Sequence, residues 1–303
     1  MTKEVKAARK VFNLIGRLSH GVSATCAALA FLRPPRSAPR PGERRVLSGG
    51  KVSFIRGSQG RIAVWQWGCG PRVLLVHGWG GHAGRLSRFV PALTAAGFGV
   101  ASFDAPAHGA SDGWFASLPD FVEAIGAVAS EVAPIALIGH SMGAAACALA
   151  VRDGLDVKAA VLVAPFVDPE KYTSRFARYL RLSEAATAGM KERLQQRYRV
   201  RFRDLMLTTS PPPVRTLVVH DRGDWRVPIR DGMAVARTWP QATLFETRGL
   251  GHHKILRSAL VIREAVEFLG GPVRAEAPRS AAPVVGRLQA GMGTLLAGAA
   301  AAH

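Results

Sequence analysis

Ser141 stands at the centre of the pentapeptide GHSMG, residues 139–143, which matches the pattern G-x-S-x-G. In that pattern the serine lies on a tight turn between a strand and a helix, in a strained conformation that projects its hydroxyl from the edge of a sheet. Gly139 and Gly143 remove side chains that would collide at such a turn. The helix that follows directs backbone N–H groups towards a developing negative charge. The motif therefore predicts a serine that attacks a carbonyl group.

A serine hydroxyl is a weak nucleophile near neutral pH, so it needs a general base, which in turn needs an acid to orient it. The segment GLGHH, residues 249–253, places two histidines after glycines that allow a sharp bend. Adjacent side chains rarely point the same way, so at most one of His252 and His253 is expected to reach the serine. The last predicted helix carries one apolar stripe: Ile255, Ala259, Ile262, Val266 and Leu269. Extended backwards, that stripe passes through His252 and favours it as the base.

A strand–helix alternation must position these residues, and it begins at residue 51. A hairpin is expected where 52–56 and 61–67, both rich in β-forming residues, are joined by a short link that contains glycine. Further strands are expected at 72–76, 98–104, 135–139, 159–164, 216–221 and 242–247, several of them continuous apolar runs. Helical patterns separate these strands. The alternation predicts the α/β class, with a doubly wound, mostly parallel β-sheet.

The domain is expected to span residues 46–270. Residues 166–210 interrupt the alternation with a basic, mostly helical stretch, which predicts a small cap insert above the sheet. Residues 1–45 form a basic N-terminal arm that ends in a Pro-rich linker at 33–45, whose composition disfavours regular structure. Residues 271–303 are rich in Ala, Gly and Pro and are expected to be a disordered tail.

The formal net charge of +19 raises nucleic acid and anionic membrane as partners. Residues 1–45 carry ten Lys or Arg against two Glu, and residues 175–203 carry nine against two, so these stretches supply 15 of the 19 charges. Neither stretch shows a zinc-finger or RNP-type pattern, so no nucleic-acid partner is expected. A solvated arm and a solvated helical face account for the charge, and a peripheral contact of the arm with anionic membrane is left open.

Cysteine usage and the N-terminal segment bear on the compartment. The three cysteines, Cys26, Cys69 and Cys147, show no metal-ligand spacing and no disulfide framework, which favours a reducing cytosol. The apolar run at 21–32 is too short to span a bilayer, which takes about 20 residues. We expect a cytoplasmic protein. A signal peptide cleaved near residues 28–30, which would imply export, is the alternative.

Four further segments, taken together with GHSMG, resemble the serine hydrolases of the α/β-hydrolase superfamily, in its esterase, lipase and thioesterase branch. They are HGWGG at 77–81, FDAPAHGAS at 103–111, HDRGDWRVP at 220–228 and GLGH at 249–252. The resemblance covers roughly residues 50–270 and is specific in combination, but it does not identify a substrate. One departure is Ala107, where related proteins often have glycine; it concerns a loop and no catalytic residue.

The resemblance implies a role for each of five residues. Ser141 would be the nucleophile, Asp224 of the D-x-x-V-P segment the acid, and His252 the base. Their order along the chain agrees with the nucleophile–acid–histidine order of the superfamily. The backbone N–H groups of Trp79 and Met142 would form the oxyanion hole.

Other side chains offer less specific alternatives. Asp221 is a second candidate for the acid, but it is more simply explained as a loop-capping residue, because D-x-x-V-P fits Asp224. His77 and His82 lie five residues apart in a Gly-rich loop, yet no further ligands accompany them, so structural contacts are expected rather than a metal site. Asp104 and His108 are expected to fix the loop that follows their strand.

These observations predict an enzyme that transfers an acyl group from a small-molecule carboxylic ester or thioester to water through acyl-Ser141. No metal or organic cofactor is expected. The elbow lacks an aspartate nucleophile, which argues against dehalogenase and epoxide-hydrolase chemistry. Perhydrolysis or acyl transfer by the same triad, and a non-catalytic binding scaffold, are the alternatives. In the cap, apolar and basic side chains could together bind an acyl chain that carries an anionic group. Alternatively, the arginines only face solvent. These side chains are Phe176, Tyr179, Leu180, Leu182, Arg175, Arg178 and Arg181.

Overall fold

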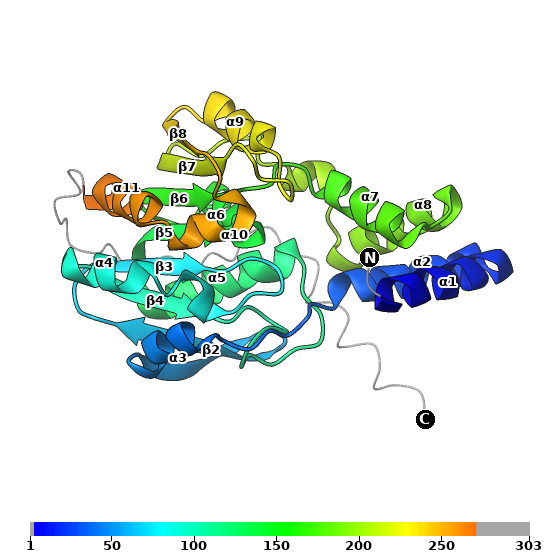
Figure 1. Ribbon diagram of the computed structural model, residues 1–303, viewed down its shortest axis with the longest axis horizontal. Helices are drawn as coiled ribbons and strands as arrows, with labels where there is room; N and C mark the ends of the chain where they lie inside the picture. The colour runs from blue at the N-terminus through cyan, green and yellow to red at the C-terminus, as the bar shows by residue number, and fades with distance from the viewer. Residues whose placement is uncertain (1–2, 271–303) are drawn as a thin grey trace, which may run out of the picture.

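A computed structural model describes residues 3–270, in which one eight-stranded sheet is flanked by helices (Figure 1). The strands are β1 Lys51–Gly57, β2 Gly60–Trp67, β3 Arg72–Val76, β4 Gly99–Phe103, β5 Pro134–His140, β6 Ala159–Val163, β7 Arg215–Asp221 and β8 Ala242–Thr247. Their order in the sheet is β1-β2-β4-β3-β5-β6-β7-β8. The β1–β2 and β2–β4 pairs are antiparallel and the remaining pairs are parallel. The predicted hairpin and the mostly parallel α/β sheet are thus confirmed.

The helices fall into three groups. Those before the sheet are α1 Lys3–Leu18, α2 His20–Leu32 and α3 Pro41–Ser48. Those between strands of the sheet are η1 Ala83–Leu86, α4 Phe89–Ala95, α5 Leu118–Val132, α6 Met142–Arg152, α7 Pro169–Leu180, α8 Glu184–Tyr198, η2 Phe202–Leu205 and α9 Ile229–Thr238. Those after β8 are α10 Gly251–Lys254, η3 Ile255–Arg257 and α11 Ala259–Gly270.

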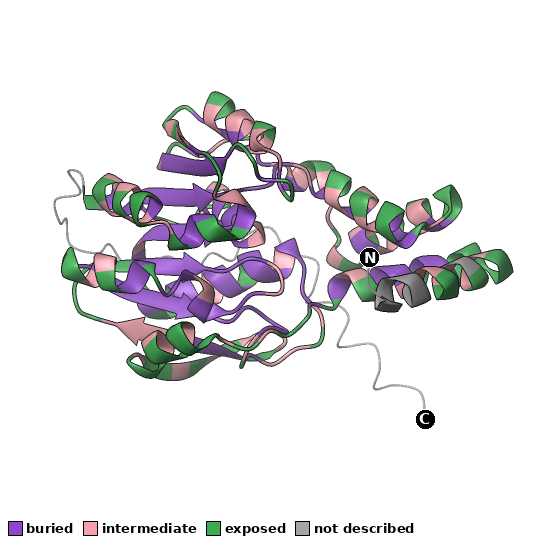
Figure 2. Cartoon of the chain, in the orientation of Figure 1, coloured by how far each residue is buried: buried purple, intermediate pink, exposed green. Residues whose placement is uncertain are grey.

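The sheet is covered on both faces, which explains why its central strands are continuous apolar runs (Figure 2). One core packs α5, α6 and α9 against the sheet, and the other packs α4 and α11 against the opposite face. Every residue of α6 from Gly143 to Val151 is buried. Five alanines in that segment let the helix lie close to the strands, so the turn before it is held firmly.

The cap is built from two separate parts of the chain. Helices α7 and α8 form the insert between β6 and β7, and α1 and α2 lie beside them at the same end of the molecule (Figure 1). An apolar cluster joins Ala24, Ala28 and Leu32 of α2 to Leu180 of α7 and Met190 of α8. The Ala-rich run of the arm is therefore a packed helix of the cap. Among the described residues, no helix is both long and apolar enough to cross a bilayer.

The expectation that residues 33–45 lack regular structure is wrong for their second half, because α3 begins at Pro41. A proline at the first position of a helix loses no hydrogen bond there. The Glu43 carboxylate also accepts a hydrogen bond from the Arg40 N–H at 2.7 Å, which closes the first turn. The predicted tail at 271–303 lies outside the described residues.

The apolar stripe expected on the last helix is confirmed at Ile255, Ile262, Val266 and Leu269, which lie in or against the core, and is wrong at Ala259. The buried positions of α11 are Val261, Ala265 and Leu269, whereas Ala259 is exposed. The helix is interrupted at Ser258, whose extended backbone separates η3 from α11. Ala259, the first residue after this break, is the one member of the stripe that does not face the core.

Candidate active site

Ser141 lies at the turn between β5 and α6, with φ 54° and ψ −115°. A non-glycine residue at such a φ is strained, and a rigid surrounding must hold it. The Ser141 N–H donates to the Val163 carbonyl of β6 at 2.9 Å, and α6 begins at the next residue. The elbow predicted from GHSMG is therefore formed, and strand pairing anchors it on one side.

The two glycines of the motif are required by close backbone contacts. A Cβ atom on Gly143 would lie 2.3 Å from the His77 carbonyl oxygen and 2.4 Å from that of Val76. A Cβ atom on Gly139 would lie 2.6 Å from Cα of Ala144. Real Cβ atoms do not come this close to backbone atoms, so α6 can approach the end of β3 only because position 143 lacks a side chain, and the turn from β5 to α6 can close only because position 139 lacks one.

We expect Gly143→Ala to lower the free energy of unfolding by about 1–3 kcal/mol or more, because the backbone of β3 must move to admit the methyl group. The matched control is Gly126→Ala in α5, where an added Cβ meets no atom within 4 Å. That change is expected to raise stability by about 0.5–1 kcal/mol through helix propensity. Urea unfolding of both variants measures the difference, and equal effects would contradict this account of the elbow.

His252 and Asp224 form a buried pair beside the elbow. The His252 Nδ1 atom lies 2.7 Å from Asp224 Oδ2, and both side chains are almost fully buried. Burial opposes ionisation of Asp224, but hydrogen bonds from His252 and from the Val227 and Arg226 amides outweigh it, so the pKa of Asp224 is lowered. An ionised Asp224 requires a proton on Nδ1 of His252. The Nε2 atom of His252 is then the one able to accept a proton.

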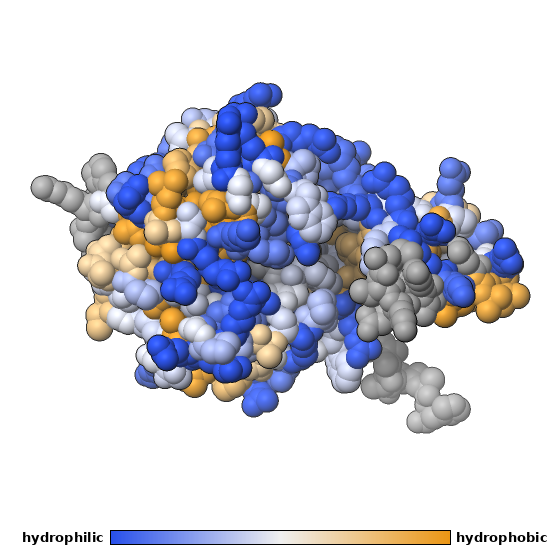
Figure 3. Space-filling view, viewed as in Figure 1, coloured by the Kyte–Doolittle hydropathy of each residue, from blue (hydrophilic) through white to orange (hydrophobic). Residues whose placement is uncertain are grey.

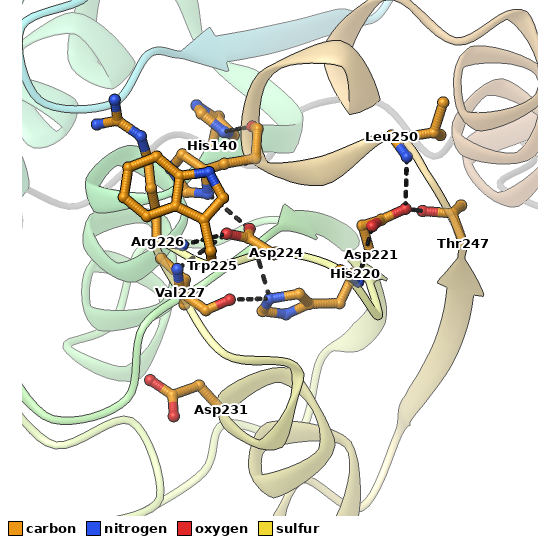
Figure 4. A network of polar contacts seen from close by, with 12 residues as sticks. His140, His220, Asp221, Asp224, Trp225, Arg226, Val227, Asp231, Thr247 and Leu250 are labelled. Atoms are coloured by element: carbon orange, nitrogen blue, oxygen red, sulfur yellow. Dashed lines mark hydrogen bonds and ion pairs between the residues drawn. The ribbon is translucent and has the colours of Figure 1, made fainter.

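Asp221 makes a different set of contacts, which fix the loop that leads to His252 (Figure 4). Its Oδ2 atom accepts hydrogen bonds from Thr247 Oγ1 at 2.8 Å and from the Leu250 N–H at 3.0 Å. Its Oδ1 atom accepts one from the Gly223 N–H at 2.9 Å. The loop-capping contacts expected of Asp221 are thus present, whereas Asp224 is the carboxylate that contacts His252.

Two further histidines support the pair, and the sequence reasoning missed both. His140 Nε2 donates to the His252 carbonyl oxygen at 2.9 Å, so the residue before the serine holds the backbone of the base. Burial and the neighbouring His252 keep the pKa of His140 well below its usual range, which leaves it neutral. His220 Nε2 donates to the Val227 carbonyl at 2.9 Å and braces the loop of Asp224 (Figure 4). Their positions, within GHSMG and at the end of β7, are the only signals in the sequence.

The HGWGG loop lies directly against the elbow. A Cβ atom on Gly78 would be 3.1 Å from Cβ of Ser141, so the backbone that leads to Trp79 passes beside the serine. The Gly80 N–H donates to His108 Nε2 at 3.0 Å, and the Gly81 N–H donates to the Gly78 carbonyl at 2.9 Å. These bonds fix the loop in the place where an oxyanion-hole turn is expected.

Two other buried histidines of this region, His77 and His108, make structural hydrogen bonds, whereas neither ring nitrogen of buried His82 has a hydrogen-bond partner among the described residues and its Nε2 atom lies 3.6 Å from Glu43. His77 Nε2 accepts from the Ala105 N–H at 3.0 Å, and burial together with His108 lowers its pKa. Burial also lowers the pKa of His108 to about 4 and that of His82 to about 4. Asp104 accepts hydrogen bonds from the Ala83 and Ala110 amides, which fixes the loop after β4 as expected. Among the described residues, no group of three or more His, Cys, Asp or Glu side chains could hold a metal ion.

Ser141 and His252 open into a cavity of about 690 Å³ between the sheet and the cap. Trp79 and Met142 line it on the side of the sheet, and Phe176 and Tyr179 line it on the side of the cap. The N-terminal arm contributes Phe31 and further residues up to Glu43, which sequence reasoning did not anticipate. Of the three cap arginines singled out from the sequence, only Arg175 lines the cavity, while Arg178 and Arg181 are exposed.

A sequence profile of the family described as serine aminopeptidase S33 matches residues 71–241, more than half of the chain. The chain belongs to this family. It is therefore an α/β hydrolase, as the five motifs indicated, and the match contains the elbow, the HGWGG loop and Asp224. No curated protein matches the chain.

Solved structures with a similar fold include an esterase, a candidate lipase and a bromoperoxidase. The esterase Pf2001 of Pyrococcus furiosus is 19% identical with a TM-score of 0.60, over 78% of this chain and 96% of that one. A candidate lipase of Acinetobacter baumannii AYE is 20% identical with a TM-score of 0.59, over 75% and 93%. A bromoperoxidase of Bacillus anthracis is 18% identical with a TM-score of 0.55, over 72% and 98%. At such identities the likeness shows the shared fold.

Proposed function

We propose that the protein is a serine hydrolase that cleaves a carboxylic ester or thioester through an acyl-Ser141 intermediate. The observation that carries the proposal is the 2.7 Å contact between Asp224 Oδ2 and His252 Nδ1, next to a strained serine elbow at the base of a large cavity. A buried carboxylate that orients a histidine beside a serine is the arrangement that activates a hydroxyl for acyl transfer.

The proposed reaction has two halves. Ser141 Oγ attacks the carbonyl carbon while His252 Nε2 takes its proton, and the N–H groups of Trp79 and Met142 bind the oxyanion. The alcohol or thiol then leaves with the proton from His252. In the second half His252 takes a proton from water, the hydroxide attacks the acyl carbon, and Ser141 recovers its proton as the carboxylic acid is released. Asp224 stabilises the imidazolium that forms in each half.

Esters fit the cavity better than the peptide substrates that the family description names. An aminopeptidase must bind the positively charged amino terminus of its substrate, for which carboxylates are the usual partners. Glu43 is the one carboxylate among the described residues that line the cavity, against six arginines, and it already lies 3.6 Å from Arg85. The likeness to a bromoperoxidase concerns the fold, so it adds no argument for perhydrolysis.

A fluorophosphonate probe tests the proposal, because it reacts covalently with an activated serine. The wild type is expected to become labelled at Ser141, and Ser141→Ala is expected to remain unlabelled. Octanoyl p-nitrophenyl ester is expected to be hydrolysed by the wild type alone. An unlabelled wild type that is correctly folded would contradict the proposal and favour a non-catalytic scaffold.

We also propose that the N-terminal helix pair contacts an anionic membrane surface. The side chains of Val11, Leu14 and Leu18 follow helical spacing on α1 and are 53%, 61% and 82% exposed. Figure 3 shows apolar side chains at the end of the molecule where α1 meets α2. Lys10 and Arg17 on the same helix are exposed. Apolar side chains beside exposed cations are typical of a helix that lies at the interface of an anionic bilayer.

Co-sedimentation with vesicles tests this contact. The protein is expected to pellet with phosphatidylcholine vesicles that contain phosphatidylglycerol, and to pellet several-fold less after Leu14→Ser combined with Leu18→Ser. The control is Val52→Ser, which removes a side chain that is 51% exposed on β1. Equal binding to vesicles of phosphatidylcholine alone, or no loss in the double variant, would show that this face does not contact an anionic membrane.

A further inference from the structure

The cavity lining combines a group of apolar side chains with a group of cationic ones. Aromatic rings lead from the active site into the cap: Phe31 stacks on Trp79 with ring centroids 6.4 Å apart, and meets Phe176 edge-on at 5.2 Å. Tyr179, Leu194 and Phe202 continue the apolar lining under the helices of the cap. This apolar part of the lining suits a hydrocarbon chain, because binding the chain would remove apolar surface of both from water.

Cations that lack acidic partners also line the cavity. Arg226, Arg257 and Arg175 line the cavity, and within residues 3–270 none of them lies within ion-pair distance of a carboxylate. The Arg175 guanidinium donates to the Arg226 carbonyl at 2.6 Å, which draws the two residues together. Arg85 lines the same cavity, although Glu43 lies near it. Charges of one sign gathered in a cleft attract a ligand of the opposite sign.

These cations lie beside the catalytic residues. Arg226 is two residues from Asp224, and its backbone N–H donates to that carboxylate. Arg257 follows His252 by five residues. Burial and His252, followed by Arg226 and Arg85, lower the pKa of the neighbouring His253 to about 4. Arg226 and Arg85 are therefore close enough to His253 for their charges to act there.

We propose that Arg226 and Arg257 bind an anionic group, a phosphate or a carboxylate, on the alcohol portion of an acyl ester whose hydrocarbon chain occupies the cap. Ser141 lines the same cavity, so the ester carbonyl of such an amphiphile would be placed there. This inference rests on the proposed function, and it adds the substrate class: an acyl ester with a charged head group. Guanidinium groups suit both anions, because they donate parallel hydrogen bonds to paired oxygens.

Three esters with one acyl chain test the proposal: 1-octanoylglycerol, 1-octanoylglycerol 3-phosphate and the octanoyl ester of glycerate. We expect kcat/KM to be at least tenfold higher for one or both anionic esters than for the neutral one, and the better of them identifies the anion. Arg226→Gln is expected to lower kcat/KM about tenfold for the anionic ester and less than threefold for the neutral ester. Arg56→Gln, an exposed arginine of β1 outside the cavity, is the matched control. A preference for the neutral ester, or equal losses on all three, would overturn the proposal.

Binding separates this inference from the proposed reaction. Octyl phosphate and octyl glucoside, both below their micellar concentrations, are titrated calorimetrically into the Ser141→Ala protein, which requires no catalysis. Octyl phosphate is expected to bind at least tenfold more tightly, and Arg226→Gln combined with Arg257→Gln is expected to abolish the difference. Equal affinities would overturn the anion site even if the ester assays succeed. Tighter binding of the phosphate without any hydrolysis would leave the anion site standing and contradict the proposed function.

Discussion

His252→Ala is expected to lower kcat/KM for a neutral ester by about 10⁴- to 10⁶-fold, because it removes the proposed base for Ser141. The Nδ1 atom of His252 contacts Asp224 at 2.7 Å, and the His252 carbonyl accepts a hydrogen bond from His140. Both contacts fix the imidazole for proton transfer. The measurement is initial-rate kinetics on purified, folded protein, with circular dichroism as the check of folding.

His253→Ala is the matched control, and we expect it to reduce kcat/KM by less than about tenfold. The His253 ring is 5.2 Å from that of His252, so the two residues share much of their environment. Within the described part of the chain, however, no carboxylate is within ion-pair distance of His253. Its lowered pKa, about 4, leaves it neutral and a weak base at pH 7. Comparable losses in both variants would mean that His252 is not the sole base.

Much of the fold and the site could be predicted because the signals are local. The elbow needs glycines at two fixed positions, a strand before it and a small-residue helix after it, and all of these lie within 134–152. The buried strands were found as apolar runs. Asp224 and His252 lie 28 residues apart in sequence, and only the known pattern of the superfamily could join them before the 2.7 Å contact was seen.

The arm could not be placed from the sequence, because its partner is distant. The apolar run at 21–32 has the composition of a packed helix, but nothing in it specifies a surface. Its contacts are with α7 and α8, about 150 residues later, and they depend on alanines that allow close approach. Phe31 and Arg33 consequently reach the cavity from a segment that was treated as lying outside the domain.

His252 is favoured as the base by the apolar stripe, but the structure positions it through other contacts. The stripe was extended backwards as though one helix ran from residue 252 to 269. The structure has α10, η3 and α11 in that span, with a break at Ser258. His252 is positioned instead by Asp221, which holds the Leu250 N–H, and by Asp224. Loop anchoring by a distant carboxylate leaves no periodic trace in the sequence.

Asp224→Asn is expected to lower kcat by about 10⁴-fold with little change in fold. The asparagine oxygen can still accept hydrogen bonds from the Arg226 and Val227 amides. Its NH₂ group would then face Nδ1 of His252 and select the tautomer in which Nε2 carries the proton. That tautomer cannot take the proton of Ser141, so the loss appears in kcat. Steady-state kinetics and urea unfolding, measured on the same preparations, separate the loss of activity from any loss of stability.

Asp221→Asn should instead lower the stability of the fold and leave most of the activity. Both oxygens of Asp221 accept hydrogen bonds, from the Thr247 hydroxyl and from the amides of Leu250 and Gly223. An amide group in that place would bring its NH₂ against donors, which costs about 1–3 kcal/mol of stability. We expect the folded protein to keep activity within about tenfold of the wild type. If Asp221→Asn instead lost activity by 10⁴-fold while Asp224→Asn did not, Asp221 would be the acid. Its carboxylate would then have to release the Leu250 amide to reach the imidazole, so the loop that carries His252 would differ in the active enzyme.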